Sequence, residues 1–209
     1  MAITTYAELK TAVARWTGGS DVSTATTMGI PNTIDDLVTI AEARIFREAR
    51  TKDTEASIDT AMTAGVVAIP SDYIALKFAY VDGSPVQTLE RRSAEWIYTT
   101  YPTRTAVGKP LYIGRDSSNF IFGPYPDSGY TLKGVYYKKL PALSSGVHAL
   151  FTNNPDLYLF ACLAESNILV AMDERIAMWE AKYNKILGDV NGIDRTEGAA
   201  GSSLQMRPG

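Results

Sequence analysis

The 209-residue sequence has a single cysteine, Cys162, and a single histidine, His148. One cysteine excludes a disulfide within the chain, and one histidine beside it excludes the usual Cys/His zinc sites. The longest apolar run, from Leu157 to Ala164, has only eight residues, whereas a membrane-spanning helix needs about 20. The sequence therefore predicts a chain stabilised by packing, with no membrane span, no metal and no other cofactor.

An excess of charge of one sign is also missing. The 20 Lys and Arg residues against 23 Asp and Glu residues leave a formal net charge of −3, with both signs interspersed. No dominant nucleic-acid or anionic-membrane surface is expected from this balance. Apolar residues make up 45% of the chain, close to the average of folded domains. The N-terminal segment MAITTYAELK has no basic stretch followed by an apolar one, so we expect no secretory leader and synthesis in a cytoplasm.

Two helices are predicted in the N-terminal quarter. Thr5 and Glu8 have the spacing of a capping box, and apolar residues then recur at steps of three and four as far as Trp16. Residues 20–32 are rich in Ser, Thr and Gly and read as a loop. The second helix is expected from Thr33 to Arg50, because acidic residues fill its first turn and arginines its last.

The middle of the chain has the period of two that is typical of strands. Turn signals separate the alternating segments, and a short helix is expected at 93–101. These patterns predict an antiparallel sheet of about six strands, folded as a small sandwich or open barrel. The expected strand segments are 54–58, 67–69, 76–81, 111–115, 119–122 and 130–138.

Helical periodicity returns at Asn153, Asn154 and Pro155, which suit the start of a helix. Residues 157–172 are apolar almost all round, which indicates a helix buried among others. A final helix capped by Asp173 carries an apolar seam that needs a helical partner. The seam consists of Ile176, Trp179, Tyr183, Ile186, Val190 and Ile193.

The succession of patterns predicts an α+β chain. Residues 1–53 and 153–195 are expected to form a helical bundle from N- and C-terminal pieces. Residues 54–152 form the inserted antiparallel β module. Residues 196–209 are dominated by Gly, Ala and Ser, and they form an extended C-terminal tail that cannot build a core of its own.

No arrangement typical of catalysis is found, and we predict no enzyme and no catalytic residue. His148 stands in a loop without a nucleophile motif, and Cys162 lies in an apolar helix, where a thiol is usually a core residue. Three carboxylate pairs sit at helix ends or in a turn, where capping and the helix dipole explain them. These pairs are Asp35/Asp36, Asp53/Glu55 and Asp173/Glu174.

Clustered arginines and tyrosines are the remaining signals. A solvated surface explains Arg44, Arg47 and Arg50. The first alternative is a subunit interface, because Arg is enriched in interfaces, and DNA binding is the third interpretation. Seven tyrosines in and around the β module exceed what one small core needs, which indicates a protein–protein surface or a ligand pocket. They are Tyr98, Tyr101, Tyr112, Tyr125, Tyr130, Tyr136 and Tyr137.

A series of short phrases runs along the chain from about Thr4 to Arg207. The phrases are Tyr6–Leu9, Ile40–Arg50, Ile69–Ile74, Tyr130–Leu132, Val135–Leu143, Asn154–Tyr158, Asp173–Arg175 and Trp179–Tyr183. In this order and spacing they resemble the head-to-tail adaptor, or connector, proteins of tailed bacteriophages, which dock on the portal.

The resemblance implies a structural protein of the virion, made in the host bacterial cytoplasm and located at the head–tail junction. Such adaptors form a ring of about twelve copies beneath the portal. The ring carries the tail proteins (nozzle, hub or tube), and genomic DNA passes through its lumen without sequence-specific binding. Their helical part builds the ring and their C-terminal extension reaches the portal, so Leu204, Met206 and Arg207 are the implied portal-binding residues.

Two other functions stay open at this point. A virion-associated peptidoglycan hydrolase would need two carboxylates held across a cleft. A carbohydrate- or ligand-binding β module would use Trp96 and the tyrosines as stacking residues.

Overall fold

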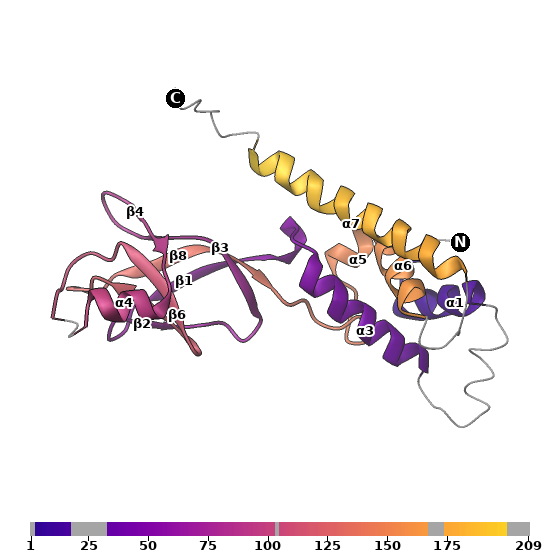
Figure 1. Ribbon diagram of the computed structural model, residues 1–209, viewed down its shortest axis with the longest axis horizontal. Helices are drawn as coiled ribbons and strands as arrows, with labels where there is room; N and C mark the ends of the chain where they lie inside the picture. The colour runs from indigo at the N-terminus through magenta and orange to yellow at the C-terminus, as the bar shows by residue number, and fades with distance from the viewer. Residues whose placement is uncertain (1–2, 18–32, 103–104, 167–173, 200–209) are drawn as a thin grey trace. The chain divides into compact units, whose positions relative to one another are not determined.

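The computed structural model describes residues 3–17, 33–102, 105–166 and 174–199 (Figure 1). The chain is α+β and divides into two compact units, Met1–Thr54 with Leu140–Gly209, and Glu55–Lys139. As predicted, helices at both ends of the chain flank a β module. Within the described residues of the first unit, the helices are α1 (Tyr6–Trp16), α3 (Thr33–Glu48), the short 3-10 helix η1 (Lys52–Thr54), α5 (Ala149–Asn153), α6 (Pro155–Glu165) and α7 (Arg175–Ala199).

The predicted capping box at the start of α1 is confirmed. The Thr5 hydroxyl accepts a hydrogen bond from the Glu8 amide at 3.2 Å, and the Glu8 carboxylate accepts one from the Thr5 amide at 3.1 Å. Both bonds satisfy amides that have no partner within the helix.

Helix α6 contacts α1, α3, α5 and α7. This central place explains its apolar composition, since Leu157, Tyr158 and Cys162 are all fully buried. The helix ends at Glu165, with Ser166 as its C-cap, so it is shorter than the apolar stretch to residue 172 indicated. Residues 167–173, including the predicted cap Asp173, lie outside the described part of the chain.

Two helical segments differ from the prediction. Helix α5 occupies a place where we expected a loop, because its five residues are too few to show a period. Helix α7 continues to Ala199, four residues into the expected tail. Extending an existing helix gains one hydrogen bond per residue, and a single Gly198 costs only about 1 kcal/mol.

The β module contains two four-stranded sheets, ordered β1-β8-β3-β4 and β2-β7-β6-β5. Neighbouring strands are antiparallel except for β5 and β6, in which Glu90 pairs with Tyr112 in parallel. Two strands more than predicted are present, because β4 and β5 have two residues each and show no alternation. The bounds are β1 (Glu55–Ala61), β2 (Val66–Ala68), β3 (Tyr73–Val81), β4 (Gln87–Thr88), β5 (Glu90–Arg91), β6 (Tyr112–Asp116), β7 (Asn119–Gly123) and β8 (Thr131–Lys138).

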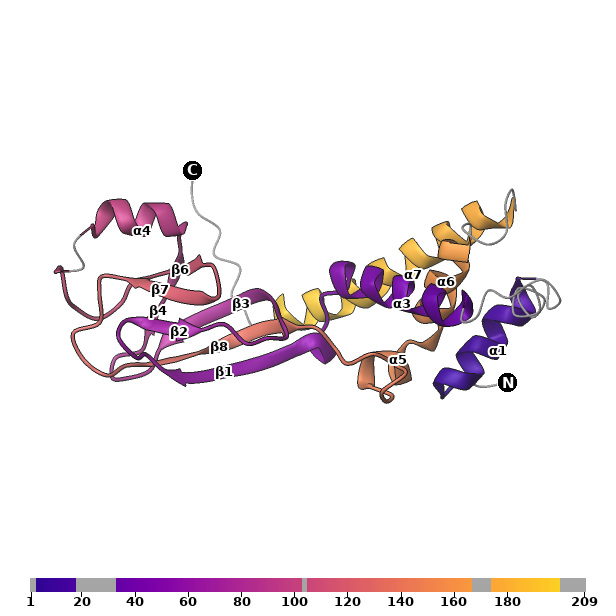
Figure 2. The same cartoon turned by 90° about the horizontal axis from the view of Figure 1, so that it is seen from below.

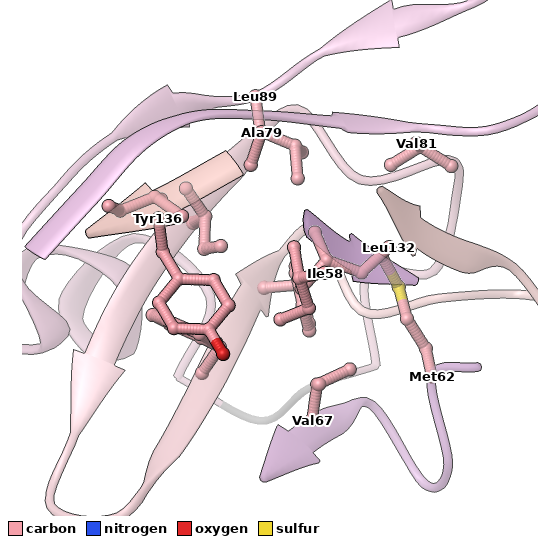
Figure 3. Packing of buried hydrophobic residues seen from close by; sticks show 12 residues of the cluster. Ile58, Met62, Val67, Ala79, Val81, Leu89, Leu132 and Tyr136 are labelled. Atoms are coloured by element: carbon pink, nitrogen blue, oxygen red, sulfur yellow. The ribbon is translucent and has the colours of Figure 1, made fainter. Parts of the chain in front are cut away.

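One apolar cluster fills the space between the two sheets, which makes the module a small sandwich (Figure 3). Alternate residues of the central strand β8 point into it, among them Leu132 and Tyr136. The cluster is formed by Ile58, Met62, Val67, Leu76, Ala79, Val81, Leu89, Ile113, Phe120, Phe122, Leu132 and Tyr136.

Helix α4 (Ala94–Thr100) packs on β6 and β7 (Figure 2). Its N-cap is Ser93, whose hydroxyl accepts a hydrogen bond from the Trp96 amide at 3.2 Å. Two glycines on the sheet face opposite the core make room for it: a Cβ at Gly114 would lie 2.8 Å from a methyl carbon of Ile97, and one at Gly123 would lie 2.8 Å from the Tyr101 ring.

Residues 140–152, which we included in the β module, make contacts with the helices. The buried Leu143 amide donates to the Glu42 carboxylate at 2.8 Å. Glu42 is only 5% exposed and lies on α3. The β module as a compact unit therefore ends at Lys139.

Candidate functional site

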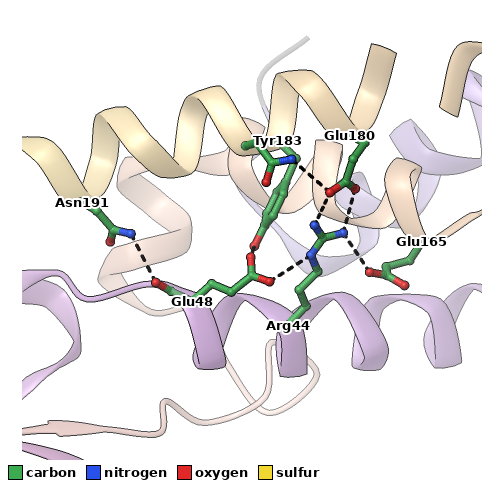
Figure 4. Close-up of polar contacts among 7 residues, drawn as sticks. Arg44, Glu48, Glu165, Glu180, Tyr183 and Asn191 are labelled. Carbon is green, nitrogen blue, oxygen red and sulfur yellow. Dashed lines mark hydrogen bonds and ion pairs between the residues drawn. The ribbon is translucent and has the colours of Figure 1, made fainter. Parts of the chain in front are cut away.

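A polar cluster centred on Arg44 joins three helices of the first unit (Figure 4). The Arg44 guanidinium on α3 holds Glu180 of α7 with two hydrogen bonds, at 2.5 and 2.9 Å, and Glu165 of α6 at 3.0 Å. Its Nε donates to Glu48 at 3.4 Å, one helical turn away. Bidentate Arg–carboxylate pairs fix geometry as well as energy, so this residue sets how the three helices pack.

Tyr183 of α7 completes the cluster from the apolar side. The centre of its ring lies 4.3 Å from the Arg44 guanidinium carbon, and its hydroxyl donates to Glu48 at 2.6 Å. Further along, the Asn191 side chain donates to the Glu48 carbonyl at 3.2 Å and accepts from the Arg50 amide at 2.8 Å. Residues later in α3 contact residues later in α7, from Arg44 with Glu180 to Glu48 with Asn191. The two helices therefore run parallel.

Electrostatics in the cluster follow from these contacts. The hydrogen bonds from Arg44 lower the pKa of Glu180, and burial raises the pKa of the Tyr183 hydroxyl. Arg44 is therefore matched by carboxylates inside its own chain, and its side chain is only 15% exposed. The arrangement links α3, α6 and α7 of the helical unit.

The three arginines of the predicted subunit interface do not gather on one surface. Arg44 points into the cluster, and the Arg50 guanidinium donates to the carbonyls of Phe46 and Ala49 at the end of α3. Arg47 lies on the exposed side of the helix. The interface role itself stays a prediction. The sequence could not show the cluster, because Glu165 and Glu180, two of its three carboxylates, lie more than 100 residues from Arg44.

The titratable groups that we considered for catalysis cap a helix, lie in the core or form hydrogen bonds and ion pairs. His148 caps α5 by accepting from the Phe151 amide at 3.4 Å, and burial lowers its pKa. Cys162 is fully buried, which raises the pKa of its thiol. Asp35 accepts from the Tyr6 hydroxyl at 2.5 Å and pairs with Lys10 at 2.9 Å; these contacts lower its pKa.

The other carboxylates of the predicted pairs are spread over different elements. Asp53 accepts from Asn153 at 3.0 Å, and Glu55 pairs with Lys77 at 2.5 Å. Asp173 falls outside the described residues. In the part of the chain that the structure describes, no three His, Cys, Asp or Glu side chains gather as a metal site would require. Over the same residues, no helix is long and apolar enough to cross a membrane.

The aromatic residues of the β module mostly pack within it. The Arg92 guanidinium carbon lies 5.1 Å from the centre of the Trp96 ring. The ring centres of Trp96 and Tyr112 are 4.8 Å apart in an edge-to-face arrangement. Some tyrosine hydroxyls donate hydrogen bonds to neighbouring carboxylates, as Tyr98 does to Asp116 at 2.6 Å. Tyr98 is nevertheless 40% exposed.

A pocket of about 490 Å³ opens beside the start of β3. Its lining combines the Tyr73 ring with Arg115, whose guanidinium carbon lies 5.7 Å from the ring centre. Nε of Arg115 donates to the Ser117 carbonyl at 3.3 Å. The pocket offers hydroxyls and one cation, and no pair of carboxylates lines it.

The tail residues Leu204, Met206 and Arg207 lie outside the described part of the chain. A comparison with family models nevertheless covers them. The model described as SU10 adaptor protein matches residues 4–207. No curated protein matches the sequence at a significant level.

Proposed function

Because the chain belongs to the SU10 adaptor protein family, we propose that it joins the portal of a tailed phage to the next tail protein. Family membership makes the chain a structural adaptor of a phage virion. The finer proposal is a ring of about twelve copies that docks under the portal, carries a nozzle, hub or tube protein, and lets DNA pass through its lumen.

The observation that carries this proposal is the extent of the match. Residues 4–207 include both units and almost all of the C-terminal segment, so the family relationship is not confined to one module. The helical unit supplies a rigid body, because the Arg44 cluster ties α3, α6 and α7 together. A ring subunit that transmits the load of a tail needs such rigidity.

The C-terminal segment is the proposed portal anchor. Residues 200–209 read AGSSLQMRPG, a composition with too little apolar surface to form a core but enough to lie in a partner's groove. Leu204 and Met206 supply the apolar contacts, and Arg207 supplies a charge that can form a bidentate bond with a carboxylate.

Co-sedimentation with purified cognate portal rings tests the proposal. The full-length chain should sediment with the portal, and the triple variant Leu204→Ala, Met206→Ala, Arg207→Ala should be lost from the pellet. The matched control, Ser202→Ala with Ser203→Ala, should behave as the parent chain. All three should melt at the same temperature. Absence of the parent chain from the pellet would overturn portal docking, and equal sedimentation of the triple variant would overturn the anchor alone.

A peptidoglycan hydrolase is the functional alternative from another class. Incubation of the full-length chain with purified cell walls should leave their turbidity unchanged, with lysozyme as the positive control. Clearing of the suspension would contradict the structural role.

A further inference from the structure

Helix α3 has a solvent-facing stripe opposite its buried side. Asp36, Ile40, Ala43 and Arg47 follow one another at steps of four, three and four, which places them on one helical face. All four are exposed, and Ile40 is 41% exposed although it is a large apolar residue. We call these four residues the α3 stripe.

Helix α7 has a second such stripe beside Trp179 and Tyr183, two buried residues of the predicted seam. The sequence placed Ile186 and Ile193 in that seam as well, but Ile186 is half-buried and Ile193 is exposed, so both belong to the stripe. Met178, Lys182, Ile186, Asp189 and Ile193 follow at steps of four, four, three and four. Met178 is 51% and Ile193 61% exposed, whereas the neighbouring seam residues Trp179 and Tyr183 are buried. We call the five exposed or half-exposed residues the α7 stripe.

The two stripes complement each other when the helices are aligned in parallel. If Asp36 faces Lys182, then Ile40 faces Ile186 and Ala43 faces Asp189. Arg47 then lies four residues, about 6 Å, beyond the level of Asp189, within reach of its long side chain. Both charge contacts then join opposite signs, which fixes register and direction. An antiparallel alignment on the same Asp36–Lys182 contact would carry Arg47 past the start of α7 and leave Ile186, Asp189 and Ile193 beyond the start of α3, whereas the parallel alignment leaves only Met178 there.

One copy of the chain does not join its own stripes. Its α3–α7 contacts run through Arg44, Glu48 and Tyr183, which lie on other faces of the two helices. These contacts also show that α3 and α7 are parallel within a copy. Copies in a ring differ by a small rotation, so α3 of one copy stays nearly parallel to α7 of the next. A contact between different surfaces of neighbouring copies is the kind that closes a ring.

We propose that the α3 stripe of one copy docks on the α7 stripe of the next copy and forms the subunit interface of the ring. The inference rests on the proposed adaptor function and adds the surface through which copies meet. Of the arginines weighed as interface residues, it assigns the role to Arg47.

Charge reversal on portal-bound protein tests the contact. Asp36→Lys and Lys182→Asp should each lower the number of full-length copies retained per portal ring, with an apparent affinity at least about tenfold weaker, because each places like charges together. The double variant should recover to within about twofold of the parent, since the pair is restored with its signs exchanged. Lys185→Asp, an exposed change outside the stripe on the same helix, is the matched control.

Disulfide trapping tests the register. A chain with Ile40→Cys and Ile186→Cys should give a ladder of covalent multimers when oxidised on the portal, because each copy bonds two neighbours. The buried Cys162 takes no part. Each single variant alone should give no multimers, and Ile40→Cys with Met178→Cys should give far fewer than the Ile186 pair.

The outcomes separate the inference from the function on which it rests. Bound copies without a ladder and without rescue in the double variant would overturn the interface while portal docking stands. A ladder only from the Met178 pair, or a bond between Ile40→Cys and the portal, would overturn it as well. Failure of the parent chain to bind the portal would overturn the proposed function itself.

Discussion

Arg44 shows how far a single residue can be interpreted from sequence. An arginine at the edge of an apolar helical stripe is compatible with solvent, a partner or an internal pair, and the local pattern is the same in each case. Its partners Glu165 and Glu180 are distant in sequence, so only the packing of α3, α6 and α7 brings them within 3.0 Å of the guanidinium. By contrast, the capping pair Thr5 and Glu8 is local, and the sequence showed it directly.

Removal of the Arg44 side chain should destabilise the helical unit. Arg44→Ala leaves Glu165 and Glu180 facing each other without the cation between them, and we expect the free energy of unfolding to fall by about 1–3 kcal/mol. Arg47→Ala removes an exposed arginine one turn along and should change it by less than about 0.5 kcal/mol. Urea unfolding of both variants measures the difference, and equal midpoints would show that the cluster contributes nothing to stability.

His148 should make stability depend on pH. Burial holds its pKa in the folded state below the ordinary 6.5, so the unfolded chain takes up a proton more readily. Stability is therefore unaffected above pH 6.5 and falls as the pH drops through 6.5 toward the lowered folded-state pKa. His148→Asn keeps an N-capping side chain and removes the titration.

Thermal melts from pH 7.5 to 5 compare the two chains. We expect the melting temperature of the parent to fall more steeply than that of the variant below pH 6.5. Parallel profiles would mean that this histidine is solvated in the folded chain. Carboxylates titrate in both chains, so their contribution cancels in the comparison.

At the scale of elements, long periodic segments were predictable and short ones were not. The patterns of α1, α3 and β8 span several periods, so each residue reinforces the same face. Helix α5 and strands β4 and β5 have between two and five residues, and tertiary contacts alone decide them. The end of α7 differs from the prediction for another reason. The Gly, Ala and Ser residues after position 195 indicate that the segment cannot form a core, but a helix can continue into such a segment.

Gly134 illustrates a requirement of the sheet that no local pattern shows. It lies in β8 between Ile58 of β1 and Ala79 of β3. A Cβ there would lie 2.4 Å from the Phe78 carbonyl oxygen, which belongs to the backbone and cannot move aside cheaply. Gly134→Ala should therefore lower the free energy of unfolding by about 1–3 kcal/mol through strain in the ladder.

Gly129→Ala is the matched control for this substitution, because a Cβ at Gly129 meets nothing within 4 Å. It should leave stability within about 0.5 kcal/mol of the parent or raise it slightly by restricting the unfolded chain. Urea unfolding followed by tryptophan fluorescence compares the two variants. If both were equally stable, β3 and β8 would have to be spaced more widely than the structure has them.

At the scale of the whole molecule, the chain enters and leaves the β module at one place. Glu55, its first residue, pairs with Tyr137 near its end, and residues paired across antiparallel strands lie about 5 Å apart. The module's core cluster consists of residues between Ile58 and Tyr136, so this core is built from the module alone. The sequence indicated an insertion because apolar residues recur with the helical period at both ends of the chain and with the strand period of two in the middle. The exact ends depended on contacts such as Leu143 to Glu42.

These features predict that each unit folds without the other. Replacing residues 55–139 with a Gly-Ser linker of about four residues should leave the helical unit folded, because its two cut ends are already neighbours. Residues 55–139 expressed alone should form the sandwich with the dispersed amide resonances of a packed β domain. Far-UV circular dichroism and a cooperative melt test the first fragment, and a two-dimensional NMR spectrum tests the second. A helical fragment that melts without cooperativity, or a module with resonances of an unfolded chain, would mean that the two cores depend on each other.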